Sequence, residues 1–207
     1  MPADLTKRAF DILASAIGLV VLSPVLLAIG LAIRLESGPP VLFRQTRVGR
    51  GGALFTIHKF RTMRPAAGSR ITAAGDPRVT RVGAFLRRTK LDELPQLWDI
   101  LRGVMSFVGP RPEVPDMLAY YPPGDRAKLL SVRPGITDLA TLEFRDEEAI
   151  LAGANDVERA YLEEVVPRKL ALATRYVDSR SFTLDMQILA RTLAALVRRP
   201  PDQPRPR

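Results

Sequence analysis

The sequence contains no cysteine and a single histidine. Without cysteine the chain can form no disulfide, no thiolate nucleophile and no cysteine-bearing zinc site. The one histidine, His58, has no second histidine with which to share a metal ion, so we predict a structural role for it. The patterns G-x-x-x-x-G-K-[ST], G-x-G-x-x-G and G-x-S-x-G are also missing. Their absence argues against the common nucleotide-binding folds and acyl-transfer enzymes.

Negative charge is scarce relative to positive charge. Lys and Arg number 31 against 22 Asp and Glu, a formal net charge of +9. This surplus attracts polyanions such as nucleic acid, anionic lipid or phosphorylated substrates, and charge alone does not choose among them. A chain of 207 residues has room for one ordinary core, so we expect one catalytic domain with appendages.

Residues 12–33 carry no formal charge and are long enough to cross a bilayer as a helix. Basic residues lie on both sides, with Lys7-Arg8 before the stretch and Arg34 after it, so the positive-inside rule assigns both ends to the cytoplasm. Ser23-Pro24 at the centre favours a break, because proline removes a backbone donor. We therefore expect a helix-break-helix that enters one leaflet and returns. A straight spanning helix is the alternative.

The remaining chain reads as short helices with one β-hairpin. Two apolar runs, 41–43 and 53–57, flank a glycine-rich turn, which indicates the hairpin. Residues 64–76 have the composition of a loop, and residues 136–144 are compatible with extended backbone. Helical spacing predicts helices over 82–88, 113–121, 125–131 and 157–177, the last interrupted near Pro167.

Residues 182–197 form an amphipathic helical pattern bordered by arginines. Its apolar positions are Met186, Leu189, Leu193, Leu196 and Val197. A basic amphipathic helix is typical of one lying on an anionic membrane, and packing against the core is an equal alternative. Residues 200–207 have the composition of a disordered basic tail.

The stretch 87–112 places an adjacent acid pair, Asp92-Glu93, among basic residues. Neighbouring side chains on a helix point about 100° apart, so the two carboxylates cannot converge on one small atom. They suit separate tasks, in which one attacks a phosphorus and the other holds Mg²⁺. Arg87 and Arg111 can bind phosphate oxygens through a bidentate fork. The alternative is that the acids open a helix and complement its dipole, with Pro95 in the first turn.

A second basic segment, Lys59-Phe60-Arg61, places two cations on one face of an extended chain, where they can reach the same anion. The alternative is a solvated strand edge protected from aggregation by its charges. Trp98 and Phe107 are predicted to anchor the core or an interface.

Six blocks of sequence follow one another from Lys7 to about Phe182. They are Lys7-Arg8-x-Phe10-Asp11 ahead of Ser23-Pro24, Gln45-x-Arg47-x-Gly49-x-x-Gly52, Lys59 to Met63, Leu91 to Leu97, Met105 to Pro112, and Arg133 to Thr137. In this order the blocks resemble those of the monotopic phosphoglycosyl transferases, bacterial sugar transferases that start glycan assembly on a polyprenol carrier.

The resemblance implies a reaction and roles for individual residues. A phosphosugar moves from a UDP-sugar to polyprenol (undecaprenyl-type) phosphate, and UMP is released, in the first membrane step of glycan synthesis. Asp92 corresponds to the nucleophile that forms a covalent phosphosugar intermediate, and Glu93 to the Mg²⁺ ligand. Arg87 corresponds to a phosphate ligand and Pro110-Arg111-Pro112 to the turn on the uridine side.

The resemblance also implies an architecture. Lys59 and Arg145 are assigned to the substrate site. We expect an α/β fold, mostly helical with a small β-hairpin or sheet. Residues 1–36 would form a re-entrant membrane hairpin, 37–199 the catalytic domain with interfacial amphipathic helices, and 200–207 the tail.

The protein is accordingly expected to be monotopic in the bacterial inner (cytoplasmic) membrane, with its catalytic domain facing the cytoplasm. Expected partners are a UDP-sugar, polyprenol phosphate and anionic lipid, with Mg²⁺ as cofactor and no nucleic acid, and homodimer formation stays open. Two alternatives stay open as well: a non-enzymatic anion-binding membrane protein, and a single-step transferase in which Asp92 is a base. The chain departs from the family pattern at 138–144, at Asp99 where Asn is common and at Val104 where Asp is common. The altered 138–144 segment leaves the identity of the sugar open.

Overall fold

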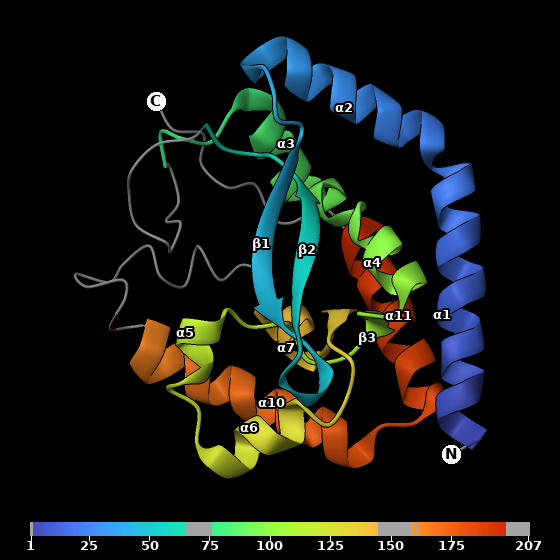
Figure 1. Ribbon diagram of the computed structural model, residues 1–207, viewed down its shortest axis with the longest axis vertical. Coiled ribbons are helices and arrows are strands. Elements are labelled where there is room, and N and C mark those ends of the chain that lie inside the picture. Colours follow the sequence, from blue (N-terminus) through green and yellow to red (C-terminus); the bar gives the residue numbers. More distant parts are fainter. Residues whose placement is uncertain (1, 65–75, 145–158, 160, 198–207) are drawn as a thin grey trace.

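The computed structural model describes residues 2–64, 76–144, 159 and 161–197. Figure 1 shows a bent pair of helices, α1 and α2, along one side and the top, a β-hairpin in the centre, and α6 and α10 at the base. Each of the two sheets in the described residues has only two strands, so helices predominate. The predicted fold, mostly helical with small sheets, is confirmed.

The N-terminal apolar stretch folds as two helices that meet at a sharp bend. α1 (Pro2–Val21) and α2 (Ser23–Ser37) are bent relative to one another by 61°. Pro24 lies in the first turn of α2, where its missing N–H would have had no helical partner. The Ser23 hydroxyl donates to the Val20 carbonyl at 2.8 Å and so satisfies a carbonyl at the end of α1. The predicted break at this serine-proline pair is confirmed.

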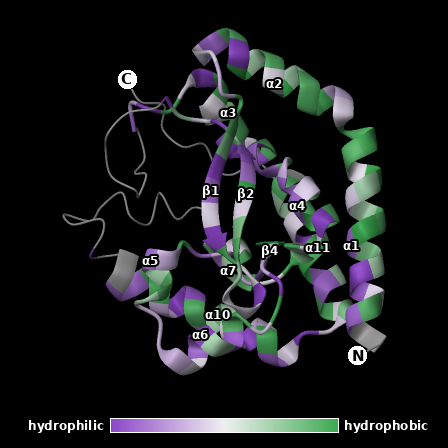
Figure 2. Ribbon diagram, viewed as in Figure 1, coloured by the Kyte–Doolittle hydropathy of each residue, from purple (hydrophilic) through white to green (hydrophobic). Residues whose placement is uncertain are grey.

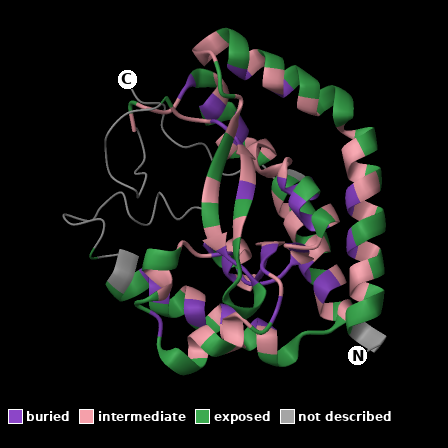
Figure 3. Ribbon diagram, viewed as in Figure 1, coloured by how far each residue is buried: buried purple, intermediate pink, exposed green. Residues whose placement is uncertain are grey.

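The outer face of α1 and α2 carries many exposed apolar side chains. Figure 2 shows this pair as largely hydrophobic, and Figure 3 shows its outer side as exposed. The exposed apolar residues include Leu13, Ile17, Val20, Val21, Leu27, Leu31 and Leu35. On the inner face, Ile29 and Ile33 are buried in one cluster with Phe60 and Leu86. The pair therefore packs on the domain with one face and leaves an apolar surface on the other, as surfaces that meet a partner or a membrane do.

No single helix in the described part of the chain combines the length and hydropathy of a membrane span. The ranges Asp4–Val21 and Ser23–Ser37 meet that test only when they are taken together across their bend. A straight spanning helix, the alternative left open by the sequence, is therefore not the conformation of this stretch.

The predicted β-hairpin is present, and its strands are longer than the apolar runs indicated. β1 (Leu42–Val48) pairs antiparallel with β2 (Leu54–Phe60) along the whole length of both strands. The connecting turn, η1 (Arg50–Gly52), holds Gly51 at a φ of 68°, a left-handed conformation that favours glycine. Because the pairing continues to the end of β2, Lys59 belongs to the strand and is held by its ladder.

Two short helices flank the acid pair. α3 (Arg81–Thr89) ends at Lys90, whose φ of 58° turns the chain out of the helix. The acids follow in a separate 3-10 turn, η2 (Leu91–Glu93), and α4 (Gln96–Arg102) begins only after Pro95. The acids therefore lie outside the first turn of α4. The alternative that they open this helix and complement its dipole does not match the structure.

The two aromatic predictions have different outcomes. Trp98 is 49% exposed, so it does not anchor the core, and its role at an interface stays a prediction. In α3, Leu86 is buried whereas the adjacent Phe85 is exposed. Phe107 does anchor the interior: its ring centroid lies 5.9 Å from that of Phe10 in α1.

A parallel strand pair that the sequence did not reveal holds the middle of the domain together. β3 (Ser106–Val108) pairs with β4 (Gly135–Thr137). The extended backbone considered for 136–144 stops at Thr137, because Asp138 accepts a hydrogen bond from the Thr141 amide at 2.6 Å and caps α7 (Leu139–Glu143). The helix predicted over 113–121 is only α5 (Pro115–Leu118), and that predicted over 125–131 is α6 (Pro123–Leu129).

The last helices close the base of the domain. A π-helical turn, η3 (Tyr161–Val165), leads into α10 (Val166–Ser179), and α11 (Phe182–Val197) matches its predicted bounds. Ile188 is buried with Val108 and Tyr176, whereas Leu193 and Leu196 are exposed. α11 thus packs on the core with one face and leaves an apolar strip on the other. Residues 200–207 and most of the loop predicted at 64–76 lie outside the described residues.

Gly83 lets α3 approach the chain that follows β2. A Cβ atom at this position would lie 2.0 Å from the Thr62 carbonyl oxygen, whereas one at Gly124 in α6 would meet nothing within 4 Å. We expect Gly83→Ala to lower the free energy of unfolding by more than about 2 kcal/mol, because backbone has to move. Gly124→Ala is the control and should be neutral or slightly stabilising. Thermal denaturation compares them, and equal melting temperatures would refute the close approach.

Candidate active site

The acid pair meets two cations from distant parts of the chain. Lys59 Nζ, on β2, donates to Glu93 Oε1 at 2.7 Å. Arg111 Nη2, in the segment after β3, donates to the same oxygen at 3.2 Å. The charges of both cations also act on Asp92. The structure therefore brings together four of the residues that the sequence assigned to the site.

Glu93 is held ionised by its neighbours. Burial alone would raise the pKa of Glu93, but the charges of Lys59 and Arg111 outweigh burial and lower it to about 2. The same carboxylate raises the pKa of Arg111. Because the folded pKa lies below the usual 4.5, this cluster stabilises the folded state above pH 4.5. That contribution is lost as the pH falls from 4.5 towards 2.

Asp92 is in the opposite condition. Burial raises the pKa of the Asp92 carboxyl and the charge of Glu93 raises it further, while Lys59 opposes both effects. Its Oδ1 atom is buried and accepts no hydrogen bond from the described residues. An oxygen without donors keeps its lone pairs unshared, as a nucleophile requires. Two adjacent acids with pKa values pushed apart are suited to two different roles.

Lys59 and Arg61 do not bind one anion, and that expectation is wrong. Burial lowers the pKa of Lys59, and the charge of Arg111 lowers it further against the pull of Glu93. Arg61 follows the end of β2, and its Nη2 donates to the carbonyl oxygens of Ser37 at 2.9 Å and Gly38 at 2.6 Å. Arg61 therefore binds the C-terminal end of α2. Of the two cations in this segment, Lys59 is the one that contacts the acid pair.

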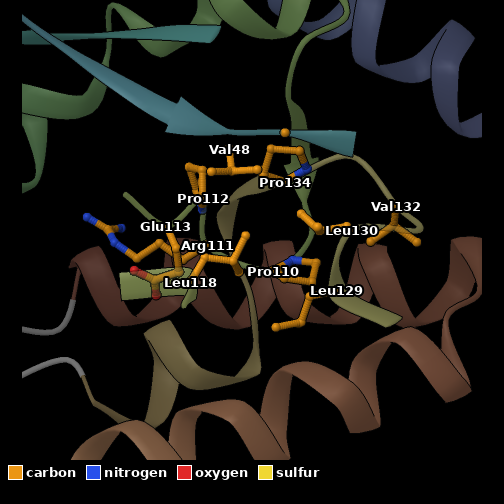
Figure 4. A pocket seen from close by; sticks show the side chains of 11 residues that line it. Val48, Pro110, Arg111, Pro112, Glu113, Leu118, Leu129, Leu130, Val132 and Pro134 are labelled. Carbon is orange, nitrogen blue, oxygen red and sulfur yellow. The ribbon is translucent and has the colours of Figure 1, made fainter. Parts of the chain in front are cut away.

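The Pro110-Arg111-Pro112 turn borders a shallow hollow. Figure 4 shows Pro110, Pro112 and Pro134 around it together with apolar side chains from the α5 and α6 region. Arg47 Nη1 on β1 donates to the Pro112 carbonyl at 2.8 Å, which fixes the turn against the β-hairpin. The turn thus presents Arg111 to Glu93 on one side and an apolar hollow on the other.

Two other residues were predicted to bind substrate, Arg87 and Arg145. Arg87 lies in the last turn of α3, shortly before the acid pair, and its role as a phosphate ligand stays a prediction. A cation at this position also stabilises the negative end of the helix. Arg145 lies outside the described residues.

A buried pair behind the site was not found from the sequence. Asp99 in α4 is fully buried and accepts from the His58 backbone amide at 2.9 Å, and its Oδ1 lies 2.7 Å from His58 Nδ1. The predicted structural role of His58 agrees with these contacts. The available signal was Asp99 itself, which departs from the pattern of the family that the sequence resembles. The pair ties α4 to the strand that carries Lys59.

A Mg²⁺ ion fits these residues only together with substrate phosphates. Among the described residues no three acidic or histidine side chains gather around a metal position. Mg²⁺ in proteins is commonly held by one or two carboxylates plus phosphate oxygens and water. Lys59 and Arg111 both donate to Glu93 Oε1, which leaves Glu93 Oε2 as the other oxygen of this carboxylate. This oxygen and Asp92 are the donors that the site offers.

Comparisons with known proteins identify the family of this chain. The family model described as bacterial sugar transferase matches residues 2–199. A UDP-glucose:undecaprenyl-phosphate glucose-1-phosphate transferase of Caulobacter vibrioides is 41% identical over 199 residues, covering 94% of this chain and 70% of its own length. An enzyme of the same description from Escherichia coli is 45% identical over 195 residues, covering 91% of this chain and 39% of its own.

Another relative is close to this chain in length. The exopolysaccharide production protein PSS of Rhizobium leguminosarum is 39% identical over 200 residues, covering 91% of this chain and 94% of its own length. The family match spans the α1–α2 pair, the acid pair and the last helix alike. The chain therefore belongs to the bacterial sugar transferase family, whose members are sugar-phosphate transferases.

Proposed function

We propose that this chain transfers a phosphosugar from a UDP-sugar to a polyprenol phosphate and releases UMP through a covalent intermediate on Asp92. The printed names of its relatives support the substrate classes. The observation that carries the covalent step is the buried Oδ1 of Asp92, which has no donor among the described residues, beside an ion-paired Glu93. Membership of an enzyme family sets aside the non-enzymatic anion-binding alternative.

In the first step an Asp92 carboxylate oxygen attacks the phosphorus that bears the sugar. A bond forms from Asp92 to phosphorus, the bond from that phosphorus to the bridging oxygen breaks, and UMP leaves with the electron pair. Arg111 lies where a fork of N–H donors can hold the phosphate oxygens. The positive charges of Arg111 and Lys59 lower the repulsion between the diphosphate and the attacking carboxylate.

In the second step a phosphate oxygen of the polyprenol phosphate attacks the same phosphorus. The bond from Asp92 to phosphorus breaks, the carboxylate is regenerated, and a polyprenol diphosphate sugar results. The two bulky substrates need never occupy the site together. When bound, Mg²⁺ on Glu93 would supply charge neutralisation at the diphosphate oxygens.

The test is mass spectrometry of the protein after mixing with donor sugar alone. We expect one phosphosugar on the peptide that contains Asp92, with one UMP released per adduct. A single-step transferase, in which Asp92 is a base, requires both substrates and gives no adduct. UMP release that depends on polyprenol phosphate, with reproducible absence of the adduct, would replace the covalent mechanism by that alternative.

We further propose that α1 and α2 insert into the cytoplasmic leaflet of the inner membrane as a re-entrant hairpin. Their exposed apolar face and the 61° bend support this arrangement. The chain lacks cysteine, so single cysteines placed at Asp4 and at Arg44, an exposed polar position shortly after α2, report the side of each end. We expect an impermeant maleimide added to spheroplasts to label neither, and to label both after lysis. Labelling of one end alone in intact spheroplasts would show a spanning helix.

The donor most strongly supported is a UDP-hexose of the glucose type. Relatives described by UDP-glucose or glucose transfer match 91–94% of this chain, whereas those described by N-acetylgalactosamine match 52–53%. UMP release from UDP-glucose and from UDP-N-acetylgalactosamine distinguishes the two. Faster turnover of the acetamido donor would reverse this assignment.

The pKa of Asp92 is expected to set the acid limb of the pH profile, and Lys59 is expected to lower that pKa. Asp92 must be ionised to attack, and its raised pKa means that activity falls as the pH drops through that value. Lys59 lowers the pKa of Asp92, so Lys59→Gln should move the acid limb of kcat/KM upward by about one pH unit. Lys90→Gln, at an exposed cation, should give a smaller upward shift. An unmoved limb in both variants would show that another group titrates.

A further inference from the structure

The two arms of the α1–α2 hairpin each reach one of the helices that flank the acid pair. At the end of α2, the Glu36 carboxylate accepts hydrogen bonds from the backbone amides that open α3. Its Oε1 lies 2.8 Å from Arg81 N, and its Oε2 lies 3.1 Å from Val82 N. These amides have no partner within the helix, so Glu36 serves α3 as an N-terminal cap supplied from another element.

Arg8 in α1 contacts the opposite kind of helix end, the C-terminus of α4. Its guanidinium donates to the carbonyl oxygens of Ile100 at 2.7 Å and Leu101 at 2.9 Å, in the last turn of the helix. The group lies against Gly103, where an added Cβ would be 3.0 Å from Arg8 Nη2. Gly103 has a φ of 85° and ends α4. Arg8 therefore fits into the end of α4 and donates to two of its last carbonyls, of which that of Ile100 also accepts from the Gly103 amide at 2.9 Å.

The sign of each charge suits the helix end that it contacts. The N-terminus of a helix carries partial positive charge, where an acid is stabilising, and the C-terminus carries partial negative charge, where a base is stabilising. Glu36 lies at the start of α3 and Arg8 at the end of α4, whereas the acid turn η2 joins the end of α3 to the start of α4. The hairpin thus holds the two flanking helices at the ends that are remote from the acids.

The end of α2 that carries Glu36 is itself held in place by other contacts. Arg61 Nη2 donates to Ser37 Oγ at 2.7 Å, in addition to its contacts with the carbonyls at this end of α2. Ile33, one turn earlier, is buried in the cluster that also contains Leu86 of α3. Movement of α2 relative to β2 and α3 would therefore carry Glu36 with it.

We propose that Glu36 and Arg8 are positioning residues that transmit the placement of the membrane hairpin to the acid pair. The apolar face of the hairpin attaches the protein, and these two charges set the spacing of α3 and α4 and hence the orientation of Asp92. The proposal rests on the proposed function of the site. A small misplacement of a nucleophile is enough to slow in-line attack strongly, by about 10²-fold for 1 Å.

The test uses full-length protein in vesicles of phosphatidylglycerol and phosphatidylethanolamine. Glu36→Gln and Arg8→Lys keep a hydrogen-bonding group and remove the charge or the fork, and Glu36→Ala removes the contact altogether. Controls make the same changes at exposed sites, Arg34→Lys on the same hairpin and Glu164→Gln before α10. We expect kcat for UMP release to fall about 10-fold or more in Glu36→Ala and Arg8→Lys, with the KM for UDP-sugar within twofold. Glu36→Gln should recover part of the loss.

Vesicle flotation and spin-label distances complete the experiment. Flotation should be unchanged in all variants, because the apolar face is intact. Labels on Ala84→Cys in α3 and Thr56→Cys in β2, both exposed, should give a broader distance distribution in Glu36→Ala than in Glu164→Gln. Activity and distances equal to the controls would overturn the proposal, as would parallel loss of flotation and folding in Glu36→Gln and Arg8→Lys. Asp92→Asn in the same assay tests the function separately, since retained UMP release there would refute the function and not the coupling.

Discussion

Asp92→Asn is expected to abolish sugar-phosphate transfer while leaving the fold as stable as before or more stable. The substitution removes the attacking oxygen charge, and losses of about 10³-fold or more are usual when a covalent nucleophile is replaced. Stability should not fall, because burial raises the pKa of Asp92 and its Oδ1 has no donor among the described residues. An ionised carboxylate in that condition destabilises the folded state at neutral pH.

UMP release from a UDP-sugar and thermal denaturation are the two measurements for this variant. Asp125→Asn in α6 makes the same chemical change at a distance from the site and should retain activity. A melting temperature for Asp92→Asn well below that of the parent would show that the carboxylate stabilises the fold. Activity within tenfold of the parent would assign the nucleophile to another residue.

Local signals were enough to predict the elements that depend on local chemistry. The break at Ser23-Pro24 follows from a proline that suits the first turn of a helix, and the bounds of α11 follow from its apolar spacing. Arg111 and Glu93 were expected in the same site because both residues lie in ordered blocks typical of the family, but their ion pair was not expected. Its geometry shows which acid is ion-paired, a distinction that spacing cannot make.

The elements that the sequence did not reveal depend on contacts far along the chain. β3 and β4 have three residues each, too few for an alternation pattern, and they exist because Gly109 and Gly135 let the two backbones approach closely. Phe85 and Leu86 are adjacent apolar residues, and which of them is buried depends on α2, which packs on α3. Arg61 was paired with Lys59 on the assumption of a continuing strand, yet β2 ends at Phe60.

The turn η2 explains why both predictions made for the acids from helix geometry were incomplete. One prediction placed them on diverging faces of a helix, and the other placed them at the start of a helix. A continuous helix from α3 into α4 would place Asp92 and Glu93 on adjacent faces, with only one of them able to face Lys59. The left-handed Lys90 breaks that helix and lets both acids lie near the same cations. The charge balance is therefore local: Lys59 and Arg111 neutralise Glu93, whereas Oδ1 of Asp92 accepts no hydrogen bond from the described part of the chain.

Removal of divalent cations is expected to stop the reaction almost completely, by more than about 10²-fold. The diphosphate of the donor and the two acids carry more negative charge than Lys59 and Arg111 can offset. EDTA should therefore abolish UMP release, and Mg²⁺ added in excess should restore it. Glu93→Gln is expected to need a higher Mg²⁺ concentration for half-maximal activity, because it replaces a charged ligand by a neutral amide.

This cation requirement also separates the two roles of Glu93. Lys59 and Arg111 contact Oε1, so Glu93→Gln weakens both ion pairs as well as the proposed metal site. Arg111→Lys perturbs the pairing and leaves the carboxylate in place, so it should lower the rate without changing the Mg²⁺ dependence. A shifted Mg²⁺ dependence in Arg111→Lys equal to that of Glu93→Gln would mean that Glu93 acts through its ion pairs alone. Undiminished turnover in EDTA would mean that basic side chains such as Lys59 and Arg111 neutralise the diphosphate of the donor without a metal ion.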